Sequence, residues 1–179
     1  MSACLKFLQS EASPYARPQL MPSSGHDHNV LSSLKVVKAT PGHLRTSLII
    51  EKRHLNNHKT IHGGVLLGVS IEAVPQAVVA DAEQLTDTVT SLAVSTLGIT
   101  APTGVSVNIS CEFVRPGGRE GDELIGIGEV IKIGVVSFFD AADKLVAFGS
   151  HTKHVGNSKA TTSFSEDGER EIPLKEAKL

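Results

Sequence analysis

The order of its apolar segments constrains the fold of this 179-residue chain most. Apolar and polar residues alternate over Leu34–Ala39 and Leu44–Ile50, on either side of a Pro41-Gly42 turn, which predicts a hairpin. A stretch rich in Ala, Val and Leu runs from His62 to Leu97 and predicts a helix that begins at Gly63-Gly64. Four more strands are predicted over Val105–Phe113, Leu124–Ile131, Val135–Phe139 and Leu145–His151. The sequence therefore predicts an α+β domain in which an antiparallel sheet wraps around one long central helix.

The composition of the chain excludes several classes of function. The chain has no long uncharged apolar run, so we expect no membrane span. A net charge of −2 offers no basic face for nucleic acid, and 4% aromatic residues offer few platforms on which bases could stack. Cys4 and Cys111 are too few for a disulfide framework or a cysteine zinc site. A reducing compartment is therefore expected.

The two ends of the chain differ in composition from its middle. Residues 1–30 mix Ser, Pro, Gln, Gly and His without the apolar region of a signal peptide, and we expect a weakly ordered head. Residues 158–179 are rich in Ser, Thr, Lys and Glu, which predicts a disordered tail. The last three residues, Ala177-Lys178-Leu179, differ from the Ser-Lys-Leu peroxisomal signal only by Ala for Ser. The expected location is cytoplasmic or peroxisomal.

Three short motifs stand in a fixed order along the chain. They read NNHKTIHGG over residues 56–64, GVSVN over residues 104–108 and GSHTKHVGN over residues 149–157. Together they resemble the small hotdog-fold acyl-CoA thioesterases, in particular the phenylacetate-type branch that includes thioesterase-superfamily member 2 and fungal relatives. The likeness covers roughly residues 31–157. It implies a hotdog fold, a homodimer that can pair into a tetramer, and an active site at the subunit interface. Coenzyme A would be part of the substrate, so no separate cofactor is expected.

The resemblance implies catalytic roles for three residues of these motifs. Gly63 matches the glycine whose N–H polarises the thioester carbonyl, and Asn56 matches the asparagine that helps to hold that carbonyl or water. One fixed donor of this kind stabilises the developing negative charge by about 2.7–4 kcal/mol. Ser106 matches the serine that, together with a helix aspartate, orients the attacking water. From the residues alone, Gly63-Gly64 also fits a tight turn, Asn56 a local cap and Ser106 a polar position on a half-buried strand.

The helix aspartate has to be sought beyond an interruption. Eight residues after Gly63, where the family has its general base, this chain has Ile71. Glu72 is the next residue and is turned by about 100° to another face of the helix, so the role does not pass to it. If Val69–Gln84 is removed, Asp87 falls at the expected spacing from Gly63. We therefore expect Asp87 of the partner subunit to activate water, with the extra segment directed away from the helix axis.

Two departures from the family pattern bear on activity. The segment Val69–Gln84 is either a genuine loop or lid, or a translated retained intron. After Lys132-Ile133-Gly134 about six residues of the family pattern are absent, which shortens a central hairpin. The resemblance places coenzyme A near this hairpin and near the last strand. It implies substrate contacts at Asn108, Phe113, Lys132, Gly134 and His154.

Histidines suggest two further kinds of site. His54, His58 and His62 recur every four residues, which on a helix would place three imidazoles on one face, as for zinc. The neighbouring Asn56-Asn57 and Lys59-Thr60 pairs indicate a loop instead, so no metal is expected. Hotdog dehydratases use a histidine with an acidic partner on the helix, and the sequence offers no clear pair of this kind.

Two functions from different classes follow from these observations. The first is hydrolysis of acyl-CoA, or of a carrier-bound acyl or polyketide thioester, to free acid and thiol. Water would be the nucleophile, because the sequence lacks the Gly-x-Ser-x-Gly elbow of serine esterases. The alternative is a non-catalytic hotdog module that binds acyl groups or serves in assembly. The insertion and the shortened hairpin favour this alternative.

Overall fold

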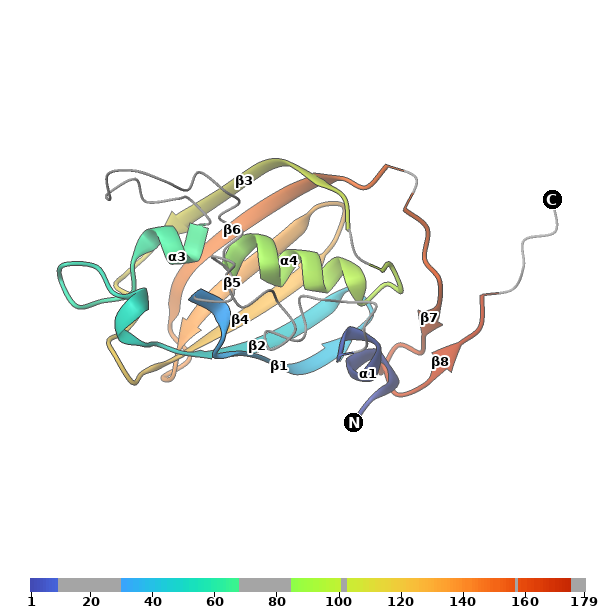
Figure 1. Ribbon diagram of the computed structural model, residues 1–179, viewed down its shortest axis with the longest axis horizontal. Coiled ribbons are helices and arrows are strands. Elements are labelled where there is room, and N and C mark those ends of the chain that lie inside the picture. Colours follow the sequence, from blue (N-terminus) through green and yellow to red (C-terminus); the bar gives the residue numbers. More distant parts are fainter. Residues whose placement is uncertain (10–29, 68–84, 101–102, 157, 175–179) are drawn as a thin grey trace.

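Six antiparallel strands form the main sheet. The computed structural model describes residues 1–9, 30–67, 85–100, 103–156 and 158–174 (Figure 1). The strands lie in the order β1-β2-β4-β5-β6-β3. Their bounds are β1 Leu34–Thr40, β2 His43–Ile49, β3 Val105–Phe113, β4 Glu123–Val130, β5 Gly134–Asp140 and β6 Leu145–His154. Every strand that the sequence predicted is present, with its ends shifted by at most three residues.

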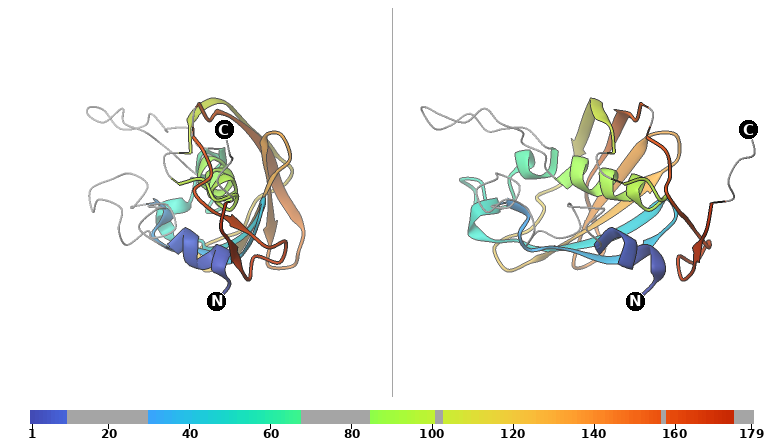
Figure 2. Two further views of the ribbon diagram at one scale, coloured as in Figure 1. Left: turned by 90° about the vertical axis from the view of Figure 1, so that its right-hand side faces the viewer. Right: turned by 45° about the vertical axis from the view of Figure 1, so that its right-hand side comes forward.

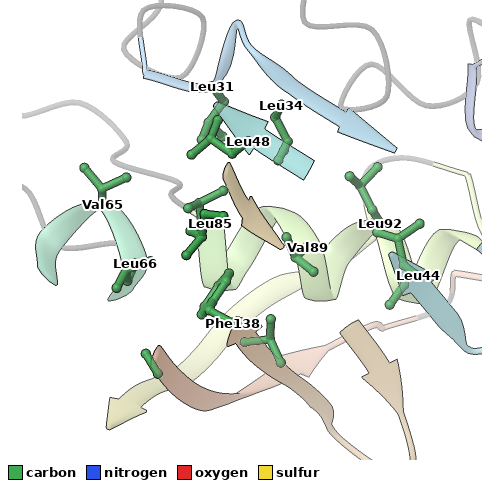
Figure 3. Packing of buried hydrophobic residues seen from close by; sticks show 14 of the residues in the cluster. Leu31, Leu34, Leu44, Leu48, Val65, Leu66, Leu85, Val89, Leu92 and Phe138 are labelled. Carbon is green, nitrogen blue, oxygen red and sulfur yellow. The ribbon is translucent and has the colours of Figure 1, made fainter. Parts of the chain in front are cut away.

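The sheet curves around α4, which spans Leu85–Ser95 (Figure 2). Every residue of α4 is buried. Its Val89 and Leu92 share one hydrophobic core with Phe138 of the sheet (Figure 3). At Gly128 of β4 the helix comes so close that an added Cβ would lie 2.8 Å from Val89 Cγ1. This close approach fixes the position of α4 and confirms the predicted α+β arrangement.

A shorter helix, α3, spans Gly63–Leu67 and adjoins the start of α4. The Thr86 hydroxyl donates to the Leu66 carbonyl at 2.5 Å. Without Val69–Gln84 these two residues would be four positions apart, which is the spacing of successive turns in one helix. The structure thus describes two adjoining segments where the sequence predicted one helix, and the insertion lies outside the described residues. None of the described helices has the length and apolar character needed to cross a bilayer.

The N-terminal head contains a helix that the sequence analysis did not expect. Helix α1 spans Ala3–Gln9, and its Cys4 and Leu8, one turn apart, are fully buried. The Phe7 ring centroid lies 5.4 Å from that of Phe164. A helix this short depends on packing rather than on its own propensity, so composition alone did not reveal it. The remainder of the predicted head, residues 10–29, lies outside the described residues.

The C-terminal segment also differs from the disordered tail that its composition predicts. Strands β7 (Ser163–Phe164) and β8 (Glu171–Ile172) form a small second sheet. The Thr161 N–H donates to the Gly98 carbonyl at 2.8 Å, which ties this segment to the end of α4. The segment gains its order from these tertiary contacts, which composition does not encode. The terminal tripeptide Ala177-Lys178-Leu179 lies outside the described residues.

Candidate active site

Asp87 stands in the first turn of α4, and its carboxylate is buried. Ser91, one turn later, donates to Oδ1 at 2.7 Å. From the sheet, Ser106 of β3 donates to Oδ2 at 3.3 Å and Lys153 of β6 donates to Oδ1 at 3.2 Å. The structure thus brings together Asp87 and Ser106, which the sequence predicted to act as a pair. Three donors hold the carboxylate in one orientation.

His151 of β6 links Ser106 to α4. Its Nδ1 lies 2.7 Å from Thr90 Oγ1 and its Nε2 lies 3.0 Å from Ser106 Oγ. A neutral imidazole donates through one nitrogen and accepts through the other. If Thr90 donates to Nδ1 and Nε2–H donates to Ser106, the Ser106 proton is left to bind Asp87. This arrangement ends on a charged acceptor, where hydrogen bonds are strongest, and leaves the Thr86 carbonyl, 2.7 Å from the Thr90 oxygen, without the Thr90 proton.

The pairing of a histidine with the helix acid was not expected from the sequence. His151 Nδ1 lies 3.4 Å from Asp87 Oδ1. Burial lowers the pKa of His151; the negative charge of Asp87 acts against this shift and the positive charge of Lys153 adds to it. The ring is therefore neutral at pH 7, and its contact with Asp87 is not an ion pair. The cation that pairs with Asp87 is Lys153, whose side chain is 9% exposed.

Two buried neutral histidines make the stability of the protein fall in mild acid. Burial lowers the pKa of both His151 and His54 below the ordinary value of 6.5. Below that pH the unfolded chain binds more protons than the folded chain, so the free energy of unfolding falls as the pH drops toward the folded pKa values. Between about pH 7.5 and about pH 5.5 we expect a loss of up to about 1.4 kcal/mol for each histidine. Urea unfolding at the two pH values measures it.

His54→Gln provides the matched test of this pH dependence. The variant should lose part of the difference between the two pH values, because one of the two buried rings is gone. His58→Gln, at an exposed loop position, should keep the full difference. Equal stability of the wild-type protein at both pH values would contradict the prediction.

Asn56 and Gly63 line a separate cavity of about 290 Å³, together with Phe113. Asn56 Oδ1 accepts from the N–H groups of His58 and Thr60 at 2.8 and 3.3 Å, as the local-cap interpretation expects. Its amide nitrogen donates to Thr60 Oγ1 at 3.0 Å, which leaves one of its two amide hydrogens free for a ligand. The Gly63 N–H donates to no described residue. A carbonyl oxygen in this cavity can therefore meet two donors.

Within one chain, the two groups of predicted catalytic residues lie at different places. The cavity at Asn56 and Gly63 is not lined by Asp87 or Ser106. Asp87 is buried, whereas Ser106 is exposed on β3, so the carboxylate approaches the surface at the edge strand of the sheet. The N–H donors of Asn56 and Gly63, which would bind the substrate carbonyl, and the Asp87 carboxylate thus form two separate half-sites.

Comparison with known proteins accounts for this combination of fold and residues. A family model described as "Thioesterase superfamily" matches residues 84–139. Human acyl-coenzyme A thioesterase 13 is 29% identical over 135 residues, which cover 72% of this chain and 84% of that protein. The crystal structure of thioesterase superfamily member 2 from Mus musculus matches with a TM-score of 0.60 and 25% identity, covering 82% of this chain and 98% of that one. Over these residues the chain is similar to proteins of the thioesterase superfamily.

The architecture of this protein is therefore the hotdog fold that the motifs implied. The crystal structure of zebrafish thioesterase superfamily member 2 has the same fold, with a TM-score of 0.60 and 23% identity, and covers 83% of this chain and 98% of that one. These matches confirm the α+β hotdog assignment made from the sequence.

The predicted substrate contacts fall in several places. Phe113 lines the cavity at Gly63. Lys132 and Gly134 line a second cavity of about 230 Å³, which His151 and Lys153 also line. The other two predicted contacts, Asn108 on β3 and His154 at the end of β6, are exposed. Their contact with substrate remains a prediction.

The three regularly spaced histidines do not share a helix face. His54 ends a 3₁₀ helix, η3, which spans Lys52–His54. Its Nδ1 accepts from the Glu51 N–H at 2.9 Å and its Nε2 donates to the Val30 carbonyl at 2.6 Å. His62 Nδ1 accepts from the Gly64 N–H at 2.8 Å. Within the described part of the chain, no three His, Cys, Asp or Glu side chains gather as metal ligands would.

The contact of His151 and Lys153, on the last strand of the sheet, with Asp87 was not predicted from the sequence. The sequence did contain a signal for this contact. His151 and Lys153 are two residues apart on a strand, so their side chains point to the same face. On the helix, Thr90 and Ser91 follow Asp87 by three and four positions and so share its face. The sequence does not show that these two faces meet. The tertiary packing of β6 against α4 shows it.

Proposed function

We propose that this protein hydrolyses acyl-CoA thioesters to a free acid and coenzyme A. The observation that carries the proposal is the buried Asp87 carboxylate, which Ser91, Ser106 and Lys153 hold in one orientation. An oriented carboxylate beside a surface serine suits a general base for water. The human relative is named an acyl-coenzyme A thioesterase, and the present chain covers most of its length.

The proposed reaction uses four residues of the chain. Asp87 takes a proton from a water that Ser106 positions, and the water oxygen bonds to the thioester carbonyl carbon. The carbonyl oxygen becomes negative and is stabilised by Asn56 and by the Gly63 N–H. Collapse of this intermediate breaks the carbon–sulfur bond, and the proton returns from Asp87 to the departing thiolate. General base assistance of this type accounts for about 10²–10⁴-fold in rate.

The proposal places each active site between two copies of the chain. Asn56 and Gly63 face one cavity, whereas Asp87 approaches the surface through Ser106 on β3. Strand β3 is an edge strand whose Val105 and Val107 are 72% and 66% exposed. A long apolar edge of this kind invites pairing with another strand. A homodimer formed along β3 would bring Asp87 of the partner subunit to Gly63, and further pairing into a tetramer stays a prediction.

The proposal also covers the group that carries the acyl chain and the location of the protein in the cell. An acyl or polyketide group on a carrier protein carries the same thioester and would react by the same steps. The Ala177-Lys178-Leu179 ending supports peroxisomal delivery, with the cytoplasm as the other location.

Thiol release from a panel of acyl-CoA and acyl-carrier thioesters tests the proposed function. We expect wild-type protein to release thiol above the uncatalysed rate. A matched variant that lacks Val69–Gln84 restores the spacing of an uninterrupted helix and asks whether the insertion matters. Activity gained only on excision would favour a retained intron. Inactivity of both proteins on every thioester would overturn the proposal and favour a non-catalytic module that binds acyl groups.

A further inference from the structure

A cavity of about 230 Å³ lies between the C-terminal part of α4, the β4–β5 turn and the end of β6. It opens beside the shortened hairpin, because β5 begins at Gly134, opposite His151, whereas β6 continues to His154. Six of the lining residues are apolar and come from all sides of the cavity. They are Val94, Leu97, Ile99, Val130, Ile133 and Val155.

The inner polar side chains of this cavity, Thr90, His151 and Lys153, make hydrogen bonds within the protein, and the remaining polar side chain of the lining, Lys132, is exposed. The Thr90 hydroxyl contacts the Thr86 carbonyl at 2.7 Å and His151 Nδ1 at 2.7 Å. The other ring nitrogen of His151 contacts Ser106. The Lys153 ammonium donates to Asp87 and, at 2.6 Å, to Ser91, neither of which lines the cavity. The interior therefore suits a ligand part that needs no hydrogen bonds.

The cavity adjoins the network of the proposed general base. His151 and Lys153 line it, and both also contact Asp87. A group bound there would thus lie one side chain away from the carboxylate. At the mouth, Leu97, Ile133 and Val155 are 38%, 36% and 39% exposed, and they form an apolar rim. Exposed apolar side chains that lie together are common at ligand-binding grooves.

The outer wall of the cavity is supported by the C-terminal segment. Ile99 forms an isolated bridge with Ala160, and the Gly98 carbonyl accepts from the Thr161 N–H at 2.8 Å. This support holds Leu97 and Ile99 in place. The residues expected to be a disordered tail therefore take part in shaping the cavity.

We propose that this cavity holds the hydrocarbon chain of the acyl substrate, and that Leu97 at its rim sets which chain lengths are accepted. This inference rests on the proposed thioesterase function. The occupant of the interior is the acyl chain rather than coenzyme A, because the phosphates and amides of coenzyme A need hydrogen-bond partners that the interior does not offer, whereas the exposed Lys132 of the lining suits a phosphate outside it. Pockets that bind small molecules are commonly apolar with few polar groups, as this one is.

Leu97→Trp tests the proposal through chain-length preference. The bulkier side chain narrows the mouth, so the ratio of kcat/KM for palmitoyl-CoA to that for acetyl-CoA should fall about tenfold or more. Val155→Trp enlarges another partly exposed residue of the lining and should act in the same direction. Val37→Trp, at a 54% exposed position of β1 that does not line the cavity, should leave the ratio unchanged. A ratio that stays constant in both rim variants would overturn the proposal.

Fluorescence provides a readout that does not require hydrolysis. The natural chain has no tryptophan, so Leu97→Trp carries a single one at the rim. A long-chain acyl-CoA analogue with a thioether in place of the thioester should shift its emission to shorter wavelength, whereas coenzyme A alone should not. The emission of Val37→Trp should not respond to either compound. If the wild-type protein hydrolyses no thioester, the proposed function fails, and this binding result alone decides whether the cavity accepts an acyl chain. An unchanged emission of Leu97→Trp in the presence of the long-chain analogue would contradict the proposal that the cavity holds the acyl chain.

Discussion

Asp87→Asn is expected to lower kcat for thioester hydrolysis about 10²–10⁴-fold, which is the contribution of a general base. Asparagine has nearly the same shape as aspartate. Its amide oxygen can accept from Ser91 in place of Oδ1, and its NH2 group, in place of Oδ2, can donate to the Ser106 oxygen. Asparagine cannot take a proton from water at neutral pH. The loss should therefore appear in kcat, with little change in KM if KM reflects binding. Steady-state kinetics on an acyl-CoA that the wild-type protein turns over measures both values.

Asp87→Asn needs a control, because it removes the negative charge that pairs with Lys153. Breaking a buried ion pair by removing one partner destabilises a protein by about 3–5 kcal/mol, because the other charge stays buried. The double variant Asp87→Asn with Lys153→Met removes both charges and should recover thermal stability without recovering kcat. Recovery of kcat together with stability would show that Asp87 acts only as a structural anion. A kcat of Asp87→Asn within tenfold of the wild-type value would contradict its role as general base.

The strands of this fold are predictable because buried and more exposed residues alternate along them, and this alternation is visible in the sequence. In β2, Leu44, Thr46 and Leu48 are buried in alternation with more exposed neighbours. In β4, Leu124, Gly126 and Gly128 alternate in the same way. One face of each strand meets the core, so the alternation follows directly from the sheet. Local pattern was therefore sufficient for the architecture.

The terminal segments were not predictable, because their order depends on residues far away in the sequence. Cys4 Sγ donates to the Thr96 carbonyl at 3.8 Å, and the Cys4 N–H donates to the Gly168 carbonyl at 2.9 Å. These contacts join the two ends of the chain to the end of α4. A short segment does not indicate in its own sequence which distant residues it will contact, so the composition of the two ends suggested disorder instead.

The candidate site was predictable only in part for the same reason. Asn56, Gly63 and Ser106 were found through motifs, because the resemblance supplies roles that spacing alone leaves open. Asp87 was found by removing an insertion, and its hydrogen bond with Ser106 agrees with that alignment. The contact between Lys153 and Asp87 joins residues 66 positions apart and depends on how β6 packs against α4. Sequence patterns show which face of a helix or strand a residue lies on, but not which face of another element packs against it.

Two inactive variants are expected to restore activity when they share a dimer. Asn56→Asp keeps the Oδ1 acceptor for the His58 and Thr60 N–H groups but removes the amide donor and adds a negative charge near the developing oxyanion. Loss of one such donor lowers kcat about 10²–10³-fold. Asp87→Asn is inactive for a different reason. In a mixed dimer, one of the two sites combines intact Asn56 and Gly63 from one chain with intact Asp87 and Ser106 from the other.

Random assortment of the two variants makes half of all dimers mixed, and each mixed dimer has one intact site of two. Co-expression with two affinity tags, or refolding of an equimolar mixture, should therefore recover roughly a quarter of the wild-type rate per chain. The matched control mixes Asp87→Asn with Ser106→Ala, whose defects lie in the same half-site and leave no intact site in any dimer. If the mixture of Asn56→Asp and Asp87→Asn stays as inactive as this control while mixed dimers are isolated through both tags, the catalytic groups of one site belong to one chain. That outcome would overturn the interface site and leave the oxyanion donors and the carboxylate to be joined by a change of shape within a single subunit.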